Sequence, residues 1–291
     1  MTRTVLVTGA AGRIGQTVCP GLADNGWMVR GTDLAALPGG VDGAQADLTD
    51  PADEPVLATL LDGADAVLHL AAIPGEDEWS RILASNVDAT QRVLAAAADA
   101  GVRRAVLASS NHATGFTRRP EQGRLPAATP PRSDTFYGVS KAALEALGAR
   151  YAERHGMDVV ALRIGSFQPR PRSPRELATW LSPGDMVRLA HATLSAPAPG
   201  FAIVWGISAN TRAWWSLSEG RALGYHPADD AEAFAEEILQ GQQPDWTGDA
   251  ELALVGGDFT TRECDTSYDW HYHSQGRQPG GRDQVGVTGT P

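Results

Sequence analysis

Short apolar segments alternate with helical patterns from residue 4 to about residue 165. Each apolar segment is compact and rich in β-branched residues, as buried strands are. Strands that alternate with helices are joined by right-handed crossovers, which gives a parallel sheet covered on both faces. The sequence therefore predicts a doubly wound, Rossmann-like α/β fold. The expected strands are 4–8, 28–33, 66–70, 104–109 and 159–164, with a short one before Asp47, and the expected helices are 14–25, 55–61, 81–100 and 137–155, two of them capped by Gly101 and Gly156.

The pattern changes after residue 165. Residues 168–175 are rich in proline and arginine, which predicts an ordered loop. A helix at 183–195, a strand at 201–205 and a helix at 229–239 are expected beyond it. We interpret 166–250 as the main part of a small C-terminal substrate lobe, within a single domain of residues 1–263. Residues 264–291 are polar and aperiodic, which predicts a flexible tail, and the histidines of His271-Tyr272-His273 lack a third metal ligand.

Charge and cysteine content exclude several classes of function. A net charge of -11 argues against binding to nucleic acid, although a small acidic substrate needs only one local arginine. Cys19 and Cys264 lie far apart, so neither a disulfide framework nor a zinc site is expected. The N-terminus lacks the features of a signal peptide, and no apolar run approaches the roughly 20 residues that span a bilayer. We expect a soluble cytoplasmic protein that does not bind membranes and holds no metal.

Three glycines stand between the first expected strand and the first expected helix, in Thr8-Gly9-Ala10-Ala11-Gly12-Arg13-Ile14-Gly15. Glycines let the backbone approach a pyrophosphate, which then rests on the helix N-terminus. The alternative is an ordinary tight turn. Three glycines at this spacing, between a strand and a helix, favour a dinucleotide site.

Acidic residues follow the next two expected strands. Asp33 lies 18 residues beyond Gly15, where a carboxylate can accept hydrogen bonds from ribose hydroxyls and would repel a 2′-phosphate. NAD is therefore favoured over NADP. Asp47 and Leu48 either flank the adenine, or Asp47 simply starts the turn towards Pro51; the sequence leaves both readings open.

Tyr137 and Lys141 are spaced to share one face of a helix. A nearby cation favours the phenolate, so we expect Lys141 to lower the pKa of Tyr137 towards the range of a general base. Ser110 ends an expected strand, at the sheet edge where ligands bind in open parallel sheets. Its hydroxyl can hold the substrate oxygen that Tyr137 deprotonates, or it can simply cap the strand end. His112 is in the same way either a site residue or a loop histidine.

The glycine loop, the strand-end serine and Tyr-x-x-x-Lys, in this order, resemble the extended short-chain dehydrogenase/reductase family. His69-Leu70-Ala71-Ala72 and Asn86 also resemble its cofactor-facing segments. The resemblance spans roughly residues 4–240. Together with the glycine loop and Asp33, it implies NAD binding by Gly9, Ala11, Gly12, Arg13, Ile14, Gly15, Asp33, Asp47, Leu48, Leu70, Ala71, Ala72, Asn86, Tyr137, Lys141 and Ile164.

Within this family the chain is most similar to the uronate dehydrogenases. The similarity lies in Ser109-Ser110-Asn111-His112, Tyr137-Gly138-Val139-Ser140-Lys141, Arg163-Ile164-Gly165-Ser166, Thr179-Trp180 and the segment from Val204-Trp205-Gly206 to Trp214-Trp215. Uronate dehydrogenases oxidise the anomeric carbon of galacturonate or glucuronate with NAD and release an aldarolactone. The resemblance implies catalysis by Tyr137, Lys141 and Ser110.

The same resemblance implies the substrate contacts. Asn111, His112 and Ser166 match positions that contact sugar hydroxyls or the carboxylate, and Arg175 matches the position that grips the carboxylate. A guanidinium forms a planar fork to a carboxylate, but Arg170 and Arg172 lie in the same loop, and only the matched position singles out Arg175.

The chain departs from the uronate dehydrogenases at one substrate-binding position, where Pro74 replaces a serine. Proline offers no side-chain donor and no backbone N–H, so the preferred sugar stays open. The alternatives are an epimerase, dehydratase or dehydrogenase acting on another sugar or nucleotide-sugar, and a non-catalytic NAD sensor. The relatives associate through helices that flank the sheet, which makes a homo-oligomer plausible.

Overall fold

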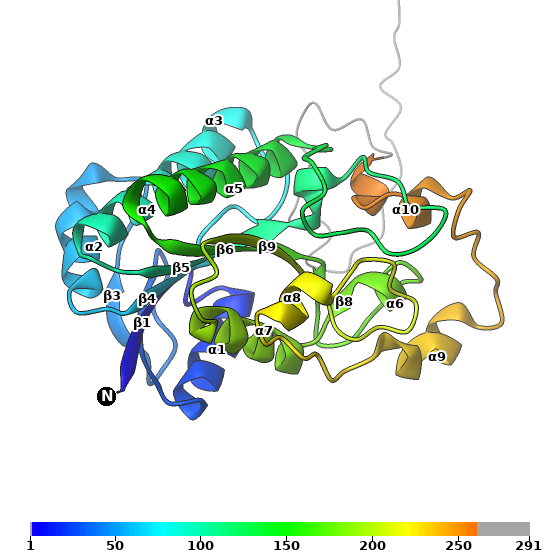
Figure 1. Ribbon diagram of the computed structural model, residues 1–291, viewed down its shortest axis with the longest axis horizontal. Coiled ribbons are helices and arrows are strands. Elements are labelled where there is room, and N and C mark those ends of the chain that lie inside the picture. The colour runs from blue at the N-terminus through cyan, green and yellow to red at the C-terminus, as the bar shows by residue number, and fades with distance from the viewer. Residues whose placement is uncertain (1, 261–291) are drawn as a thin grey trace, which may run out of the picture.

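The computed structural model describes residues 2–260. The expected tail at 264–291, with Cys264 and the two histidines near residue 272, lies outside the described residues. Within the described part, seven parallel strands form one sheet in the order β3-β2-β1-β4-β5-β6-β9 (Figure 1). The strands are β1 (Arg3–Thr8), β2 (Trp27–Asp33), β3 (Asp42–Gln45), β4 (Ala66–His69), β5 (Arg104–Ser110), β6 (Asp158–Ile164) and β9 (Phe201–Gly206).

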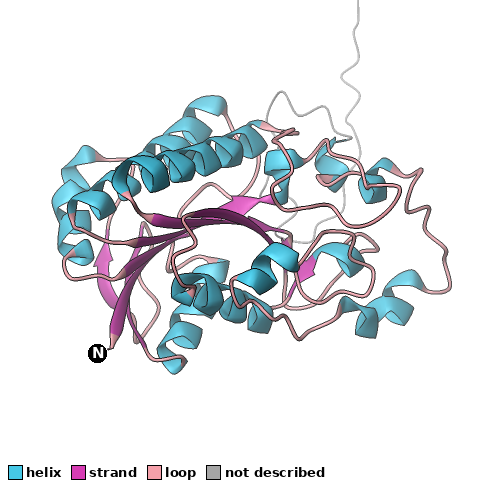
Figure 2. Cartoon of the chain, in the orientation of Figure 1, coloured by secondary structure: helices cyan, strands magenta, loops and turns pink. Residues whose placement is uncertain are grey.

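Helices cover both faces of this sheet (Figure 2). Helices α1 (Arg13–Asp24) and α7 (Pro183–Ser195) pack together on one face, and α2 (Glu54–Leu61), α4 (Ala89–Asp99) and α5 (Phe136–His155) pack on the other. Successive strand residues point to opposite faces, so Val5 and Val7 join the core under α1 and α7 while Leu6 joins the core under α4 and α5. The predicted Rossmann-like class is confirmed.

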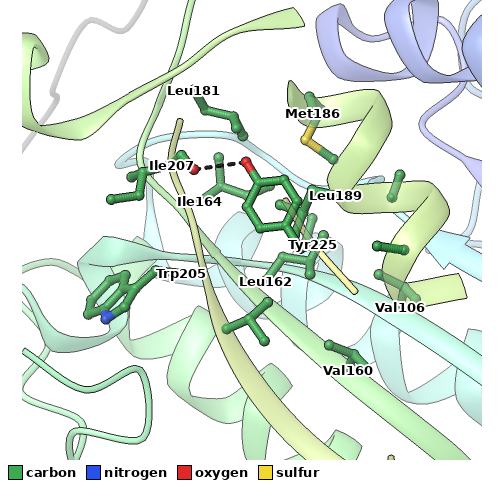
Figure 3. Close-up of a cluster of buried hydrophobic side chains, with 14 of the residues drawn as sticks. Val106, Val160, Leu162, Ile164, Leu181, Met186, Leu189, Trp205, Ile207 and Tyr225 are labelled. Carbon is green, nitrogen blue, oxygen red and sulfur yellow. Dashed lines mark hydrogen bonds between the residues drawn. The ribbon is translucent and has the colours of Figure 1, made fainter. Parts of the chain in front are cut away.

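The core under α7 extends to the C-terminal part of the chain. Tyr225 is fully buried against Leu189 and Ile207, and its hydroxyl donates a hydrogen bond to the Ile207 carbonyl at 2.8 Å (Figure 3). A buried phenol needs such a partner, since an unbonded hydroxyl in an apolar core is costly. Residues beyond β9 are thereby anchored to the main sheet.

Most predicted elements are observed, and two differ in form. The helix expected at 81–100 is α3 (Trp79–Ile82), a π-helical segment (Leu83–Asp88) and α4. The helix expected at 229–239 is a 3₁₀ turn (Ala231–Phe234) followed by α9 (Ala235–Leu239). Gly101 and Gly156 have φ of +74° and +64°, as expected of glycines that end α4 and α5.

The region expected as a substrate lobe contains two kinds of element. Strand β9 is an edge strand of the main sheet, and helix α7 packs on one face of this sheet. Helix α8 (Ser218–Ala222) packs on β9. Other elements lie beyond the carboxyl ends of the strands (Figure 1). They are β7 (Ser166–Phe167) paired with β8 (Trp180–Leu181), α6 (Glu176–Thr179), α9, α10 (Ala250–Ala253) and the 3₁₀ turn Gly257–Thr260. No helix within residues 2–260 is long and apolar enough to cross a membrane.

Candidate active site

A cleft of about 750 Å³ opens at the carboxyl ends of the central strands. Ligands bind at this edge in doubly wound folds, because loops from strands on both sides of the topological switch meet there. Every predicted site residue except Asn86 lines the cleft: Gly9, Ala11, Gly12, Arg13, Ile14, Gly15, Asp33, Asp47, Leu48, Leu70, Ala71, Ala72, Pro74, Ser110, Asn111, His112, Tyr137, Lys141, Ile164, Ser166 and Arg175.

The glycine loop packs too closely for side chains at two positions. Gly9 has φ of +70°, and a Cβ there would lie 2.7 Å from the Ala71 nitrogen. A Cβ at Gly15 would lie 2.3 Å from the Gly9 carbonyl oxygen. The N-cap of α1 is Gly12, which has no side chain to occupy the first N–H groups of the helix. Such an uncovered helix N-terminus beside a glycine loop fits a dinucleotide pyrophosphate.

Two aspartates, Asp33 and Asp47, line the same cleft as the glycine loop. Asp33 accepts hydrogen bonds from the backbone N–H groups of Ala11 (2.9 Å) and Ala35 (3.0 Å). Each carboxylate oxygen has a further lone pair for a ribose hydroxyl. Asp47 accepts from both the N–H and the hydroxyl of Thr49, at 2.8 and 2.7 Å. Asp47 therefore does start a turn, and it lines the cleft as well.

Asn86 does not face the cofactor region as its sequence motif suggests. Its side chain is fully buried in the π-helical segment. The amide accepts from the Ile73 N–H at 2.8 Å and donates to the Ile73 carbonyl at 3.1 Å and to the Ser140 hydroxyl at 3.0 Å. The loop after β4 has no neighbouring strand, so the Asn86 side chain forms the hydrogen bonds that the Ile73 N–H and C=O need. Asn86 thereby supports Ile73, which lines the cleft.

Tyr137 and Lys141 lie on the buried face of α5. The Lys141 ammonium donates to the Ala108 carbonyl at 2.8 Å and lies 5.4 Å from the centre of the Tyr137 ring. Ser110 lies beside Tyr137 and lowers its pKa, and the Ser110 oxygen accepts from the His112 N–H at 3.2 Å. Ser110 is thus both a strand-end cap and a neighbour of the tyrosine.

The sequence-based expectation for the pKa of Tyr137 is wrong for this arrangement. Burial raises the pKa of Tyr137 to about 12, and Ser110 offsets only part of this effect. Burial also lowers the pKa of Lys141 to about 8. Desolvation disfavours the charged form of both groups, and this outweighs the attraction that the spacing suggested.

The residues expected to contact the substrate form a second hydrogen-bonded group in the cleft. Arg175 donates to the Ser166 hydroxyl at 3.3 Å and to the Val255 carbonyl at 2.6 Å, while its buried Nε has no partner. The Asn111 amide also donates to the Val255 carbonyl, at 3.0 Å. Arg170 instead pairs with Glu237 at the surface. Of the three loop arginines, only Arg175 lines the cleft.

The sequence reasoning missed two parts of the site. Gly256, Asp258 and Phe259 line the cleft, and the Phe259 ring lies 4.3 Å from that of His112. Glu76 is buried at the start of α5, where it accepts from the N–H groups of Phe136 and Tyr137. Neither segment has a motif that would reveal it, although Glu76 follows Pro74 closely in the sequence.

Comparison with known proteins places this geometry among related enzymes. Residues 5–195 match the NAD dependent epimerase/dehydratase family. A uronate dehydrogenase of Pseudomonas putida is 35% identical over 88% of this chain and 94% of the relative. An NAD-dependent glucose-6-phosphate dehydrogenase of Haloferax volcanii is 37% identical over 81% of this chain and 97% of the relative. The crystal structure of a mutant uronate dehydrogenase from Agrobacterium tumefaciens, complexed with NAD, matches with a TM-score of 0.82 and 35% identity over 91% of this chain and 99% of that one.

Proposed function

The chain belongs to the NAD-dependent epimerase/dehydratase family, and from this premise we propose that it oxidises the anomeric carbon of a hexuronic acid, galacturonate or glucuronate, with NAD. The relatives support an NAD-dependent sugar dehydrogenase of the uronate dehydrogenase type. When bound, NAD supplies the acceptor for the hydride that leaves C1. The residues of this chain bind the sugar and remove the proton.

The proton at the C1 hydroxyl goes to Tyr137 in its phenolate form, because the neutral phenol, which burial favours, cannot accept a proton. Ser110 orients the same oxygen, since it lies beside Tyr137 and lines the same cleft. The two electrons of the C1–H bond leave with the hydride while the O–H electrons form the C1=O bond of the lactone. Lys141 keeps a positive charge beside Tyr137 as negative charge develops there.

The carboxylate of the sugar acid goes to Arg175. The observation that carries this choice is that Arg175 is the one arginine of the 168–175 loop that lines the cleft, which also contains Tyr137. A guanidinium forms two parallel hydrogen bonds to a carboxylate, with fork geometry. Arg13, at the cofactor end, already donates to Phe167 and Gln168.

The proposal is tested by following NADH absorbance while the purified protein is offered NAD and one sugar at a time. The panel contains galacturonate, glucuronate, galactose, glucose, glucose-6-phosphate and a UDP-sugar. We expect NADH with one or both uronates and at least tenfold lower kcat/KM with the neutral sugars, because the carboxylate contact is lost. NADH with glucose-6-phosphate or galactose but none with either uronate contradicts the proposal.

A further inference from the structure

Asp134 is a buried acid with no assigned role, immediately before the cap of the helix that carries Tyr137. Its side chain is 0% exposed. One carboxylate oxygen accepts from His112 Nδ1 at 2.7 Å, and the other accepts from the Thr135 hydroxyl at 3.0 Å. A buried carboxylate must have donors around it, so these contacts hold it in one place.

Two glycines from distant segments make room for this carboxylate. A Cβ at Gly115 would lie 1.9 Å from Asp134 Oδ2, and one at Gly256 would lie 1.8 Å from the same atom. Gly115 has φ of −54°, so the backbone there accepts any residue and glycine is needed only for space. The Gly256 N–H donates to the Gly115 carbonyl at 2.9 Å. Two chain segments therefore close around one oxygen atom.

The position of Asp134 dictates which nitrogen of His112 carries hydrogen. An ionised carboxylate only accepts, so Nδ1 of His112 must be the donor in this bond. In a neutral imidazole the other nitrogen, Nε2, is then an acceptor. The His112 ring is held from its sides by Phe259 and Tyr137, at centroid distances of 4.3 and 5.8 Å, and it lines the cleft.

We propose that Asp134 is a positioning residue that fixes His112 as the Nδ1–H tautomer and so presents Nε2 as an acceptor for a hydroxyl of the sugar. This inference rests on the proposed function and deepens it. It divides recognition between two groups: Arg175 donates to the carboxylate, and His112 accepts from a hydroxyl. A sugar that lacks this hydroxyl cannot donate a hydrogen bond to His112 Nε2 and should therefore bind more weakly.

The tautomer is measured directly, without any substrate, by NMR of the protein carrying ¹⁵N-labelled histidine. His112 is assigned by the signals that disappear in His112→Gln. At a pH where the ring is neutral, the wild type should show a protonated Nδ1 and an unprotonated Nε2 at His112, and Asp134→Ala should lose this pattern. An Nε2–H tautomer in the wild type, or no change in Asp134→Ala, overturns the inference.

Kinetics separate a positioning role from a purely structural one. Asp134→Ala should raise KM for the uronate by about tenfold or more while the affinity for NADH changes by less than about twofold. Asp134→Asn keeps an acceptor for Nδ1–H and should restore KM to within about threefold of the wild type. If Asp134→Asn is as impaired as Asp134→Ala, the charge of Asp134 rather than its acceptor oxygen matters, and the positioning role proposed for Asp134 fails.

Gly115→Ala provides a test that leaves Asp134 itself in the sequence. The added methyl group must displace the carboxylate, so this variant should show the raised KM and the altered His112 signals of Asp134→Ala. Gly39→Ala is the matched control, because a Cβ there meets nothing within 4 Å. Equal behaviour of the two alanine variants contradicts the inference. If the wild type oxidises no uronate, the proposed function fails, and the NMR measurement still decides the tautomer.

Discussion

Lys141 is the only lysine in the sequence, and it is 3% exposed. Burial lowers its pKa to about 8, whereas an unfolded chain has a lysine pKa of about 10.4. The unfolded state therefore holds this proton more tightly, and stability falls as the pH drops from about 10 to 8 and stays reduced below that. The lysine is retained at this site at the expense of stability, as expected where a charge is needed for chemistry.

Lys141→Met should therefore be inactive yet more stable than the wild type. Relief of the buried charge exceeds the loss of the bond to the Ala108 carbonyl, so we expect the free energy of unfolding at pH 7 to rise by about 1 kcal/mol in urea titrations. The pKa itself can be read by NMR of ¹³C-lysine-labelled protein, since a single lysine gives a single set of signals. A less stable variant, or a Lys141 pKa near 10, contradicts this account.

The raised pKa of Tyr137 could not be predicted from the sequence, although the position of this residue could. The spacing of Tyr137 and Lys141 correctly predicts that both side chains line one cleft. It says nothing about solvent exclusion, and here desolvation sets both pKa values. Burial depends on segments distant in the sequence, so local spacing could not give it.

At the scale of elements, helix α5 is fixed at its N-terminal end, next to Tyr137. Thr135 caps it by accepting from the Gly138 N–H at 3.0 Å, and Glu76 takes the N–H groups of Phe136 and Tyr137 with separate oxygens. A carboxylate at a helix N-terminus also complements the helix dipole. Glu76 thus ties the loop after β4 to the residue proposed as the base.

Glu76→Gln should lower kcat by about tenfold with little change in NADH affinity. The amide has one acceptor oxygen, so one of the two helix N–H groups then faces an NH₂ and the first turn shifts. Steady-state kinetics with the uronate and NADH titration by fluorescence check this. Glu78→Gln, two residues away on the same loop, is the control and should match the wild type. Unchanged kcat in Glu76→Gln contradicts the positioning role.

Further along α5, Glu145 accepts two hydrogen bonds from Arg163 of β6, both at 2.8 Å, and one from Ser109 at 2.6 Å. All three side chains are buried. Removing one partner leaves an uncompensated charge, so Glu145→Ala should lower the free energy of unfolding by about 3–5 kcal/mol. Urea denaturation measures it. Glu153→Ala, nearer the end of α5, is the control, and a comparable loss there would show that the buried ion pair is not the cause.

Element prediction succeeded where a local pattern exists. Strands β1 and β6 are largely apolar runs, and the glycine loop lies between a strand and a helix, so all three can be predicted from the sequence. The part that Val255 plays in the site cannot be predicted, because it comes from contacts with Asn111 and Arg175, which lie 144 and 80 residues earlier. The partner of Asn86 in the π-helical segment is likewise in a separate loop, at Ile73.

For the whole molecule, a buried network joins the layers beneath the cleft. His69 bonds Thr8 at 2.8 Å and Thr90 at 3.0 Å, and Thr90 donates to the Asn86 carbonyl at 2.6 Å. Because the Thr90 proton is used there, His69 Nε2 is the donor to Thr90 and Nδ1 accepts from Thr8. Burial, and to a smaller extent the charge of Lys141, lowers the pKa of His69 to about 3.

Lowering the pH should destabilise the protein already at pH values above those at which carboxylates become protonated. An unfolded histidine has a pKa of about 6.5, so the unfolded state binds more protons than the folded state between about 6.5 and 3. Stability is complete above 6.5 and declines as the pH falls, at up to about 1.4 kcal/mol per pH unit for this residue. Urea titrations from pH 7 to 5 measure the slope. His69→Gln should flatten it relative to the wild type, although His191, whose pKa is also lowered, leaves some dependence. An unchanged slope in His69→Gln contradicts the assignment.

The central claim is that this cleft takes a hydride from C1 of a uronate while Tyr137 takes the proton. The direct test is to supply [1-²H]galacturonate or [1-²H]glucuronate with NAD and to locate the deuterium by mass spectrometry and NMR. We predict deuterium on the nicotinamide ring and an aldarolactone as the first product, with Tyr137→Phe forming neither while still binding NADH. Reduced cofactor without deuterium, or full turnover by Tyr137→Phe, would contradict the account.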